Sequence, residues 1–336
     1  MRQGRRRSWI GRAVLAVIVL IPLAAAAPAR AANCTSQAEM QPTDRDQIAA
    51  AGMQIAADIV NQDEAALQGA LLPAVASDWE GIRAAAERAQ GLVKGGQIQI
   101  RNLYLLDATS LSAPADTQFF CSDLTGALTV TLMMRGLPPG RYAVVLADAV
   151  GAPLAGQLGF ILGWYKAAPA WRLGGLSARP GVFDGHDGVW YWSRAREVAK
   201  SNLTWSAWYC YEAARYLLLP VDYLSSPNME KLAHEQELLK DSPREAFPIT
   251  LTDGPRSWKI DGVQLDPTLN EPDLGVMYET MGVTDPAAAR TEATAVMSAL
   301  VKSHLGLREN FHGLWAYAMK DGKRTFAMEL PMTQIP

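Results

Sequence analysis

The first clear hydrophobic pattern, between Thr43 and Val93, has apolar residues at helical spacing. Ile48, Ile55 and Ile59 recur on one face, as the 3.6-residue period of an amphipathic helix requires. Thr43 or Asp44 is the expected cap of this first helix. Two shorter helices are expected over residues 63–72 and 78–93, the second capped by Asp78 and ended by Gly95-Gly96. The pattern therefore predicts three helices.

A two-residue alternation replaces the helical period after residue 97. Residues 98–106, the short run Phe119-Phe120-Cys121, and residues 157–165 and 171–177 read as strands. Residues 128–134 and 142–146 alternate on either side of the turn Gly136-Leu137-Pro138-Pro139-Gly140. That arrangement predicts a long hairpin in an antiparallel sheet.

The stretch from Val189 to Pro220 is dense in tryptophan and tyrosine and forms two helix-length segments joined at Lys200-Ser201-Asn202. In the second segment Trp205, Trp208 and Tyr209 fall on one helical face. We expect an antiparallel helical hairpin. The spacing of its small and aromatic residues (Ala195, Ala207, Tyr211 and Ala214) resembles a single tetratricopeptide repeat, without a second copy.

The remaining residues predict a small α+β unit. Residues 248–265 suggest a hairpin about Asp253-Gly254, and residues 274–279 another strand. Asp285-Pro286 opens a helix that Gly306 ends. A final hairpin turns at Asp321-Gly322, which would place Trp315 opposite Met328 and Tyr317 opposite Phe326, on a face that covers the helix.

These elements predict an α+β protein in three parts: residues 32–182, a helical linker over 183–245, and residues 246–336. Three helices before a strongly bent antiparallel sheet, with the closing strand GWYKAAPAWRLGGL, resemble the cone-shaped superfamily of ketosteroid isomerase, scytalone dehydratase and nuclear transport factor two. The resemblance covers residues 43–180. It implies an apolar pocket between helices and sheet, used for catalysis in some members and for binding in others.

Residues 1–31 have the form of an export signal. A basic start precedes an apolar run, Ala13 to Ala27, and the small-residue site Ala29-Arg30-Ala31. We expect cleavage near Ala31 and a periplasmic or secreted bacterial envelope protein. Cleavage would remove six of the 31 basic residues and none of the 34 acidic ones, leaving 25 against 34, a net charge of −9. Such an acidic chain is a poor partner for nucleic acid.

Three cysteines remain after the signal, Cys34, Cys121 and Cys210. In an oxidising compartment one disulfide is expected, and Cys34–Cys121 is the preferred pair, because it would tie an N-terminal arm to a strand. Cys210 lies among helical aromatics and is interpreted as a small buried apolar group.

The sequence has none of the standard metalloprotease, nucleophile-elbow, phosphate-loop or dinucleotide motifs, and no cofactor is expected. The compact cluster of ligand-type side chains is Asp184, His186 and Asp187. These residues could hold a metal with one further ligand. Alternatively, the glycines turn the chain there and Asp187 caps the next helix. His304 continues an apolar helical stripe and is interpreted as a core or helix-end histidine.

Three functions stay open. The first is a non-catalytic ligand-binding or scaffold protein with an apolar pocket in the N-terminal part, for a small apolar ligand or an envelope protein. The second is a cofactor-independent lyase, isomerase or hydrolase that pairs an acid with a pocket tyrosine. The third is an interaction module that uses the aromatic hairpin, unless its stripe instead joins two flanking domains. The candidate pocket or interaction residues are Tyr104, Tyr142, Phe160, Trp164, Trp205, Trp208 and Tyr209, and the candidate acids are Asp107, Asp123 and Asp148.

Overall fold

Helices open the described chain after a short strand, β1 (Asn33–Ser36). The computed structural model describes residues 32–122, 129–280, 282 and 285–336, so the expected export signal lies outside it. The first helix begins one residue before the expected cap, with Gln41 at the N-cap and proline in the first turn, and Asp78 caps α3 without a side-chain hydrogen bond. The helical segments are α1 (Pro42–Asn61), α2 (Glu64–Gly69), the 3-10 turn η1 (Pro73–Asp78) and α3 (Trp79–Val93).

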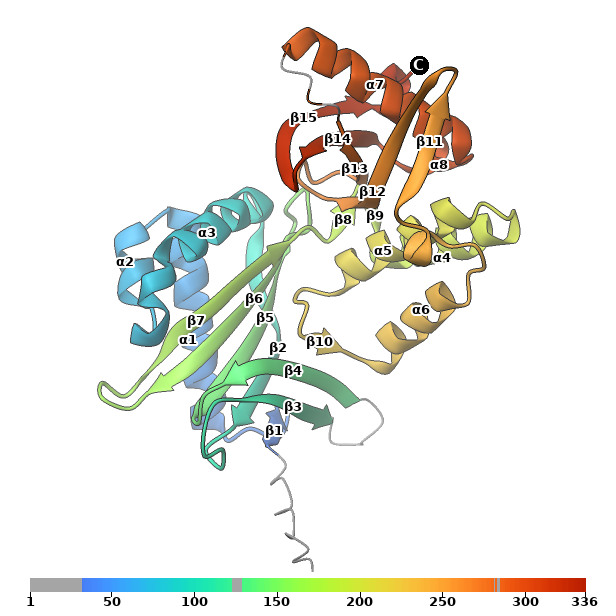
Figure 1. Ribbon diagram of the computed structural model, residues 1–336. Helices are drawn as coiled ribbons and strands as arrows, with labels where there is room; N and C mark the ends of the chain where they lie inside the picture. Colours follow the sequence, from blue (N-terminus) through green and yellow to red (C-terminus); the bar gives the residue numbers. More distant parts are fainter. Residues whose placement is uncertain (1–31, 123–128, 281, 283–284) are drawn as a thin grey trace, which may run out of the picture. The chain divides into compact units, whose positions relative to one another are not determined.

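The helices cover one face of an antiparallel sheet with the order β1-β2-β5-β6-β7 (Figure 1). Alternate residues of its strands, such as Leu103, Val145 and Phe160, pack with Ile48 and Ile55 of α1 in one buried core. The residues between them point to the opposite face. The strands are β2 (Gln97–Asp107), β5 (Arg141–Val150), β6 (Gln157–Tyr165) and β7 (Ala170–Arg179).

A second, smaller sheet of order β10-β4-β3 covers that opposite face. Its strands are β3 (Ala115–Ser122), β4 (Thr129–Leu137) and β10 (Leu224–Ser225). The predicted hairpin between residues 128–134 and 142–146 is therefore wrong, because β4 pairs with β3 while β5 pairs with β2 and β6. The turn at Pro138-Pro139 carries the chain from one sheet to the other, and Leu132 packs against Val144 and Leu146 across the layers.

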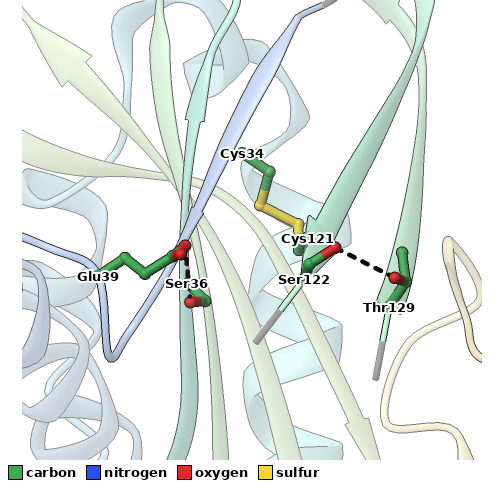
Figure 2. The surroundings of a disulfide bond; sticks show 6 residues. All are labelled: Cys34, Ser36, Glu39, Cys121, Ser122 and Thr129. Carbon is green, nitrogen blue, oxygen red and sulfur yellow. Dashed lines mark hydrogen bonds between the residues drawn. A yellow bond between two sulfur atoms is a disulfide. The ribbon is translucent and has the colours of Figure 1, made fainter. Parts of the chain in front are cut away.

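A disulfide links the two sheets (Figure 2). It joins Cys34 of β1 to Cys121 of β3, with a Cα–Cα distance of 5.1 Å and a sequence separation of 87. The remaining cysteine, Cys210, is buried, and burial raises the pKa of its thiol to about 12. It acts as a small apolar group in the core.

The central hairpin consists of α4 (Gly188–Lys200) and α5 (Thr204–Leu218), preceded by the small pair β8 (Val182–Phe183) and β9 (His186–Asp187). Its buried residues share one core with the C-terminal sheet, where Tyr209 and Tyr211 pack with residues such as Trp258. Two further helical segments follow, α6 (Pro227–Glu237), which Ser226 caps, and η2 (Pro243–Glu245).

The C-terminal sheet has the order β11-β12-β13-β14-β15, with β13 and β14 parallel and the other pairs antiparallel. Figure 1 shows α7 against this sheet, and Val296 and Leu300 of α7 are buried with Leu314 and Ala316 of β14. The elements are β11 (Ile249–Asp253), β12 (Arg256–Asp266), β13 (Asp273–Glu279), α7 (Pro286–Ser303), α8 (Leu307–Asn310), β14 (Gly313–Lys320), β15 (Lys323–Pro331) and η3 (Met332–Gln334).

The last hairpin turns where expected but in another register. Trp315 lies opposite Glu329, not Met328, and Tyr317 lies opposite Ala327, not Phe326. The cause is a bulge between Ala318 and Met319, which leaves an extra residue on β15. A one-residue slip exchanges the two faces of a strand. On β15 the slip therefore puts Glu329 and Ala327 on the face of Trp315 and Tyr317. The alanines of β14 are buried in one core with α7, so Trp315 and Tyr317 lie on the sheet face away from α7.

Candidate functional site

A groove of about 740 Å³ lies on the face of the N-terminal sheet that is turned away from the helices. The resemblance implied a pocket between helices and sheet, but the buried side chains of α1, α3, β5 and β6 pack directly on one another there. The groove walls instead come from η1, from β4 and its turn, and from the segment before β10. Its lining residues are Leu72, Ala74, Val75, Met133, Met134, Arg135, Gly136, Leu137, Pro138, Tyr142, Ile161, Gly174, Asp222 and Tyr223.

Glycines on β6 and β7 make room for Leu72, a residue of the groove wall. A Cβ atom at Gly163 would collide with Leu72 Cδ1, and one at Gly174 would lie 3.2 Å from the same atom. The strand face therefore lacks side chains beneath Leu72, which is held in place because its backbone N–H donates to Leu173 O over 2.8 Å. The β6–β7 pair also has a bulge between Ile161 and Leu162. The missing side chains thus let Leu72 lie close against the backbone of both strands.

Tyr142 and Asp222 of the groove have partners in the protein, whereas the Tyr223 hydroxyl is buried without a hydrogen-bond partner in the described structure. The Tyr142 hydroxyl donates to Pro138 O over 2.9 Å, and burial raises its pKa. Asp222 is 2.6 Å from the guanidinium of Arg179 while its side chain remains 79% exposed. The groove is thus an apolar surface with polar groups at its margin.

Of the residues predicted for a pocket in this part of the chain, only Tyr142 lines the groove. Phe160 is fully buried on the helix side of the sheet. Trp164 lies on that side too, edge-to-face with Trp171 at a centroid distance of 5.4 Å. Tyr104 is buried between the two sheets, and burial raises its pKa. Alternation showed that these strands have buried faces, but not which face borders an open space.

The candidate acids of the N-terminal part each have a structural partner or lie outside the described chain. Asp107 accepts hydrogen bonds from the Thr109 hydroxyl at 2.6 Å and the Thr109 N–H at 2.9 Å. These hydrogen bonds lower the pKa of Asp107. Asp148 lies 3.2 Å from the guanidinium of Arg101. Asp123 is outside the described residues.

The aromatic stripe of the central hairpin (Trp205, Trp208 and Tyr209) packs against other parts of the protein rather than facing solvent. Tyr209 is 1% exposed and its hydroxyl donates to Val263 O over 3.1 Å. Trp205 and Trp208 are half-buried against the same core. His304 stacks on Trp205 with ring centroids 3.5 Å apart, and burial lowers the pKa of this imidazole to about 4. The stripe therefore joins the hairpin to the C-terminal sheet and α7.

The loop with Asp184, His186 and Asp187 uses its side chains locally. Asp187 caps α4, since its carboxylate accepts a hydrogen bond from Trp190 N at 2.8 Å. His186 stacks on the Trp190 ring with centroids 3.8 Å apart. Asp184 takes the left-handed backbone conformation that the turn requires, with φ 47°. The capping interpretation thus describes this loop, and the three side chains do not converge on one point in the described structure.

A different polar group does converge, on the C-terminal sheet. Asp273, His312 and Glu329 have potential ligand atoms within 4.8 Å of one another. Burial raises the pKa of Asp273 and of Glu329. The sequence did not predict this group, because its members come from three chain segments, 39 and 17 residues apart. No local spacing indicates that they meet.

Comparisons with protein-family models, with curated proteins and with solved structures found no match. Within the described residues, no helix has both the length and the apolar character needed to cross a membrane. Function is therefore argued from the geometry of the sites themselves.

Proposed function

We propose that this is an exported bacterial envelope protein that binds a small apolar molecule in the groove beside β4, without catalysing a reaction on it. The observation that carries the proposal is the groove itself, about 740 Å³ in volume and lined mainly by apolar side chains. Ligand pockets in proteins commonly measure about 300–1,000 Å³ and are largely apolar. Export is supported by the basic and apolar residues 1–31 and by the disulfide, because disulfides persist in oxidising compartments.

The lining suits an apolar molecule of variable shape. Met133 and Met134 supply flexible, polarisable side chains that adapt to irregular ligands. Met133 is 43% exposed in the protein alone, so a ligand would remove apolar surface from water. The glycine floor lets the ligand approach the backbone of β7.

A catalytic role in the same groove would need a carboxylate that faces Tyr104 or Tyr142. The Tyr142 hydroxyl is instead bonded to a backbone carbonyl, and Asp222 is paired with Arg179. A general base also works best with a pKa near the working pH, whereas hydrogen bonds lower the pKa of Asp107. These contacts favour binding over the acid–tyrosine mechanism.

Titration with the fluorescent apolar probe N-phenyl-1-naphthylamine tests the proposal. Met133→Arg would place a charge in the groove, and we expect it to weaken probe binding about tenfold or more, because an unpaired charge is costly to desolvate. The matched control is Phe120→Arg on the neighbouring strand. Phe120 is 60% exposed and lies outside the groove, so this variant should bind as the wild type does. Absent binding to the wild type, or equal affinities for both variants, would refute the proposal.

A further inference from the structure

Three side chains gather at one end of the C-terminal sheet, and we call them the Asp-His-Glu cluster: Asp273, His312 and Glu329. Asp273 is the first residue of β13, His312 directly precedes β14, and Glu329 lies on β15. His312 Nδ1 is 3.0 Å from Asp273 Oδ1. The strand order places β14 between β13 and β15 (Figure 1), so neighbouring strands bring the three residues together.

The backbone fixes the cluster firmly. His312 N donates to Pro272 O over 3.2 Å, and His312 O accepts from Met332 N over 2.8 Å. Glu329 is placed by the β15 bulge, which puts it opposite Trp315 on the face away from α7. Without the bulge, the neighbouring apolar residue Met328 would occupy that position.

The carboxylates are buried with oxygen atoms that lack partners. Asp273 is fully buried, and its Oδ2 has no hydrogen-bond partner in the described structure. Glu329 Oε1 is also buried without one. Buried polar atoms are nearly always hydrogen-bonded, so each orphan suggests a missing ligand.

The neighbouring acid Asp266 differs from Asp273 in the hydrogen bonds that its carboxylate accepts. Asp266 lies directly across from Asp273 on β12 and is almost as buried, 6% exposed. Its carboxylate accepts from the Tyr317 hydroxyl at 2.5 Å and from the N–H and hydroxyl of Thr268 at 3.1 and 2.5 Å. The sheet can therefore satisfy a buried carboxylate fully at this end, whereas Asp273 has His312 at 3.0 Å and the Trp315 indole as a weaker neighbour.

Gly313 provides the space in which the two carboxylates meet. A Cβ atom there would lie 2.5 Å from Glu329 Oε1 and 3.0 Å from Asp273 Oδ1. Any other residue would push these oxygens away. The side chain of His312 is 43% exposed, which opens the cluster to solvent on one side.

We propose that the Asp-His-Glu cluster binds a divalent transition-metal cation, with Zn²⁺ as the best fit. Two carboxylates and one imidazole form a borderline nitrogen–oxygen set, which suits zinc better than calcium or magnesium. The 3.0 Å between His312 Nδ1 and Asp273 Oδ1 has to widen only to about 3.3–3.6 Å for two tetrahedral ligands that each lie about 2.0–2.2 Å from one zinc ion. Two carboxylates also balance the charge of the cation, and a fourth position stays open toward solvent.

Isothermal titration of the full-length exported protein with Zn²⁺ tests this site, after dialysis against a chelator. We expect one zinc ion per chain. His312→Gln and Glu329→Gln should each weaken binding at least about tenfold, since loss of even an outer-shell partner typically has that effect. His234→Gln and Glu279→Gln are the matched controls, because both residues are exposed and lie outside the cluster. These controls should bind as the wild type does.

Cobalt substitution gives a second measurement. Co²⁺ bound at the cluster should show visible absorption bands that disappear in His312→Gln but persist in His234→Gln. Thermal unfolding of each variant without metal identifies any that has not folded. If one of the two cluster variants does not fold, the other still provides the test. No zinc binding by the wild type, or binding that the cluster variants retain, would overturn the proposal. In that case Asp273 and His312 form only an ion pair.

Discussion

Cys34 is bonded to Cys121, and this bond ties the edge strand of the helix-covered sheet to the smaller sheet above it. The two strands belong to different layers, so no backbone ladder between them replaces the bond. The loop that it closes contains the helices α1, α2 and α3 and the strand β2. The groove lies between these same layers, so its shape depends on how firmly they are joined.

Removing the disulfide should destabilise the protein strongly. For a loop of 87 residues, the entropic model gives a loss of about 4.6 kcal/mol in the free energy of unfolding. Urea denaturation of the double variant Cys34→Ala/Cys121→Ala against the oxidised wild type measures it. The reduced wild type should match the variant. Cys210→Ser keeps the disulfide, so reductant should destabilise it by the same amount as the wild type. Coincident transitions for oxidised and reduced wild type would contradict the expectation.

The stacking of His304 on Trp205 predicts a pH dependence of stability. The pKa of His304 is lowered to about 4 by burial, against about 6.5 in an unfolded chain. The folded state thus binds fewer protons between these values. Above about pH 6.5 the contribution of His304 to the free energy of unfolding does not change with pH. Below that value, stability falls as the pH drops toward about 4. Because His304 is only partly buried, we expect a loss on the order of 1 kcal/mol.

His304→Phe checks this assignment, since phenylalanine keeps a ring against Trp205 but does not titrate. The difference in free energy of unfolding between the wild type and His304→Phe should change between pH 7 and pH 4. The same comparison with His234→Gln should stay constant, because His234 is exposed on α6. Parallel pH profiles for the wild type and His304→Phe would show that His304 is not the responsible group.

The α+β class and most element positions followed from local patterns. Helical spacing identified α1, α5 and α7, and alternation identified β6 and β13, because each period depends only on neighbours in sequence. Capping by Asp187 and Ser226 was predictable for the same reason. The resemblance to the ketosteroid isomerase superfamily stays a prediction.

Strand pairing and the two candidate sites could not be predicted from local patterns, because they depend on residues far apart in the chain. The alternation around Leu132 showed a buried face but not whether the strand pairs with β5 or packs over it. The β15 bulge placed Glu329 rather than Met328 opposite Trp315, which a hairpin without a bulge does not anticipate. Both candidate sites depend on such features: the groove on glycines beneath Leu72, and the Asp-His-Glu cluster on three strands.

The cap at α4 allows a test of the loop that carries Asp184, His186 and Asp187. Asp187→Ala removes the hydrogen bond to Trp190 N and should lower the free energy of unfolding by about 1 kcal/mol. Asp184→Asn should change it little, because asparagine also accepts the left-handed conformation found there. Chemical denaturation measures both, and zinc titration should give the wild-type affinity for each. A loss of zinc binding in either variant would assign the metal to this loop instead.

The close approach of Leu72 to Gly163 predicts coupling between the two positions. Gly163→Ala puts a methyl group where Leu72 Cδ1 lies and should cost about 1–3 kcal/mol through overpacking. Leu72→Ala frees that space, so the double variant should be more stable than the sum of the single effects by about 0.5–3 kcal/mol. Gly91→Ala on α3 is the control. Its Cβ meets nothing within 4 Å, so alanine should stabilise the helix by about 0.5–1 kcal/mol. Additive effects at Gly163 and Leu72 in urea denaturation would show that the leucine moves freely, and that the groove floor is not set by this contact.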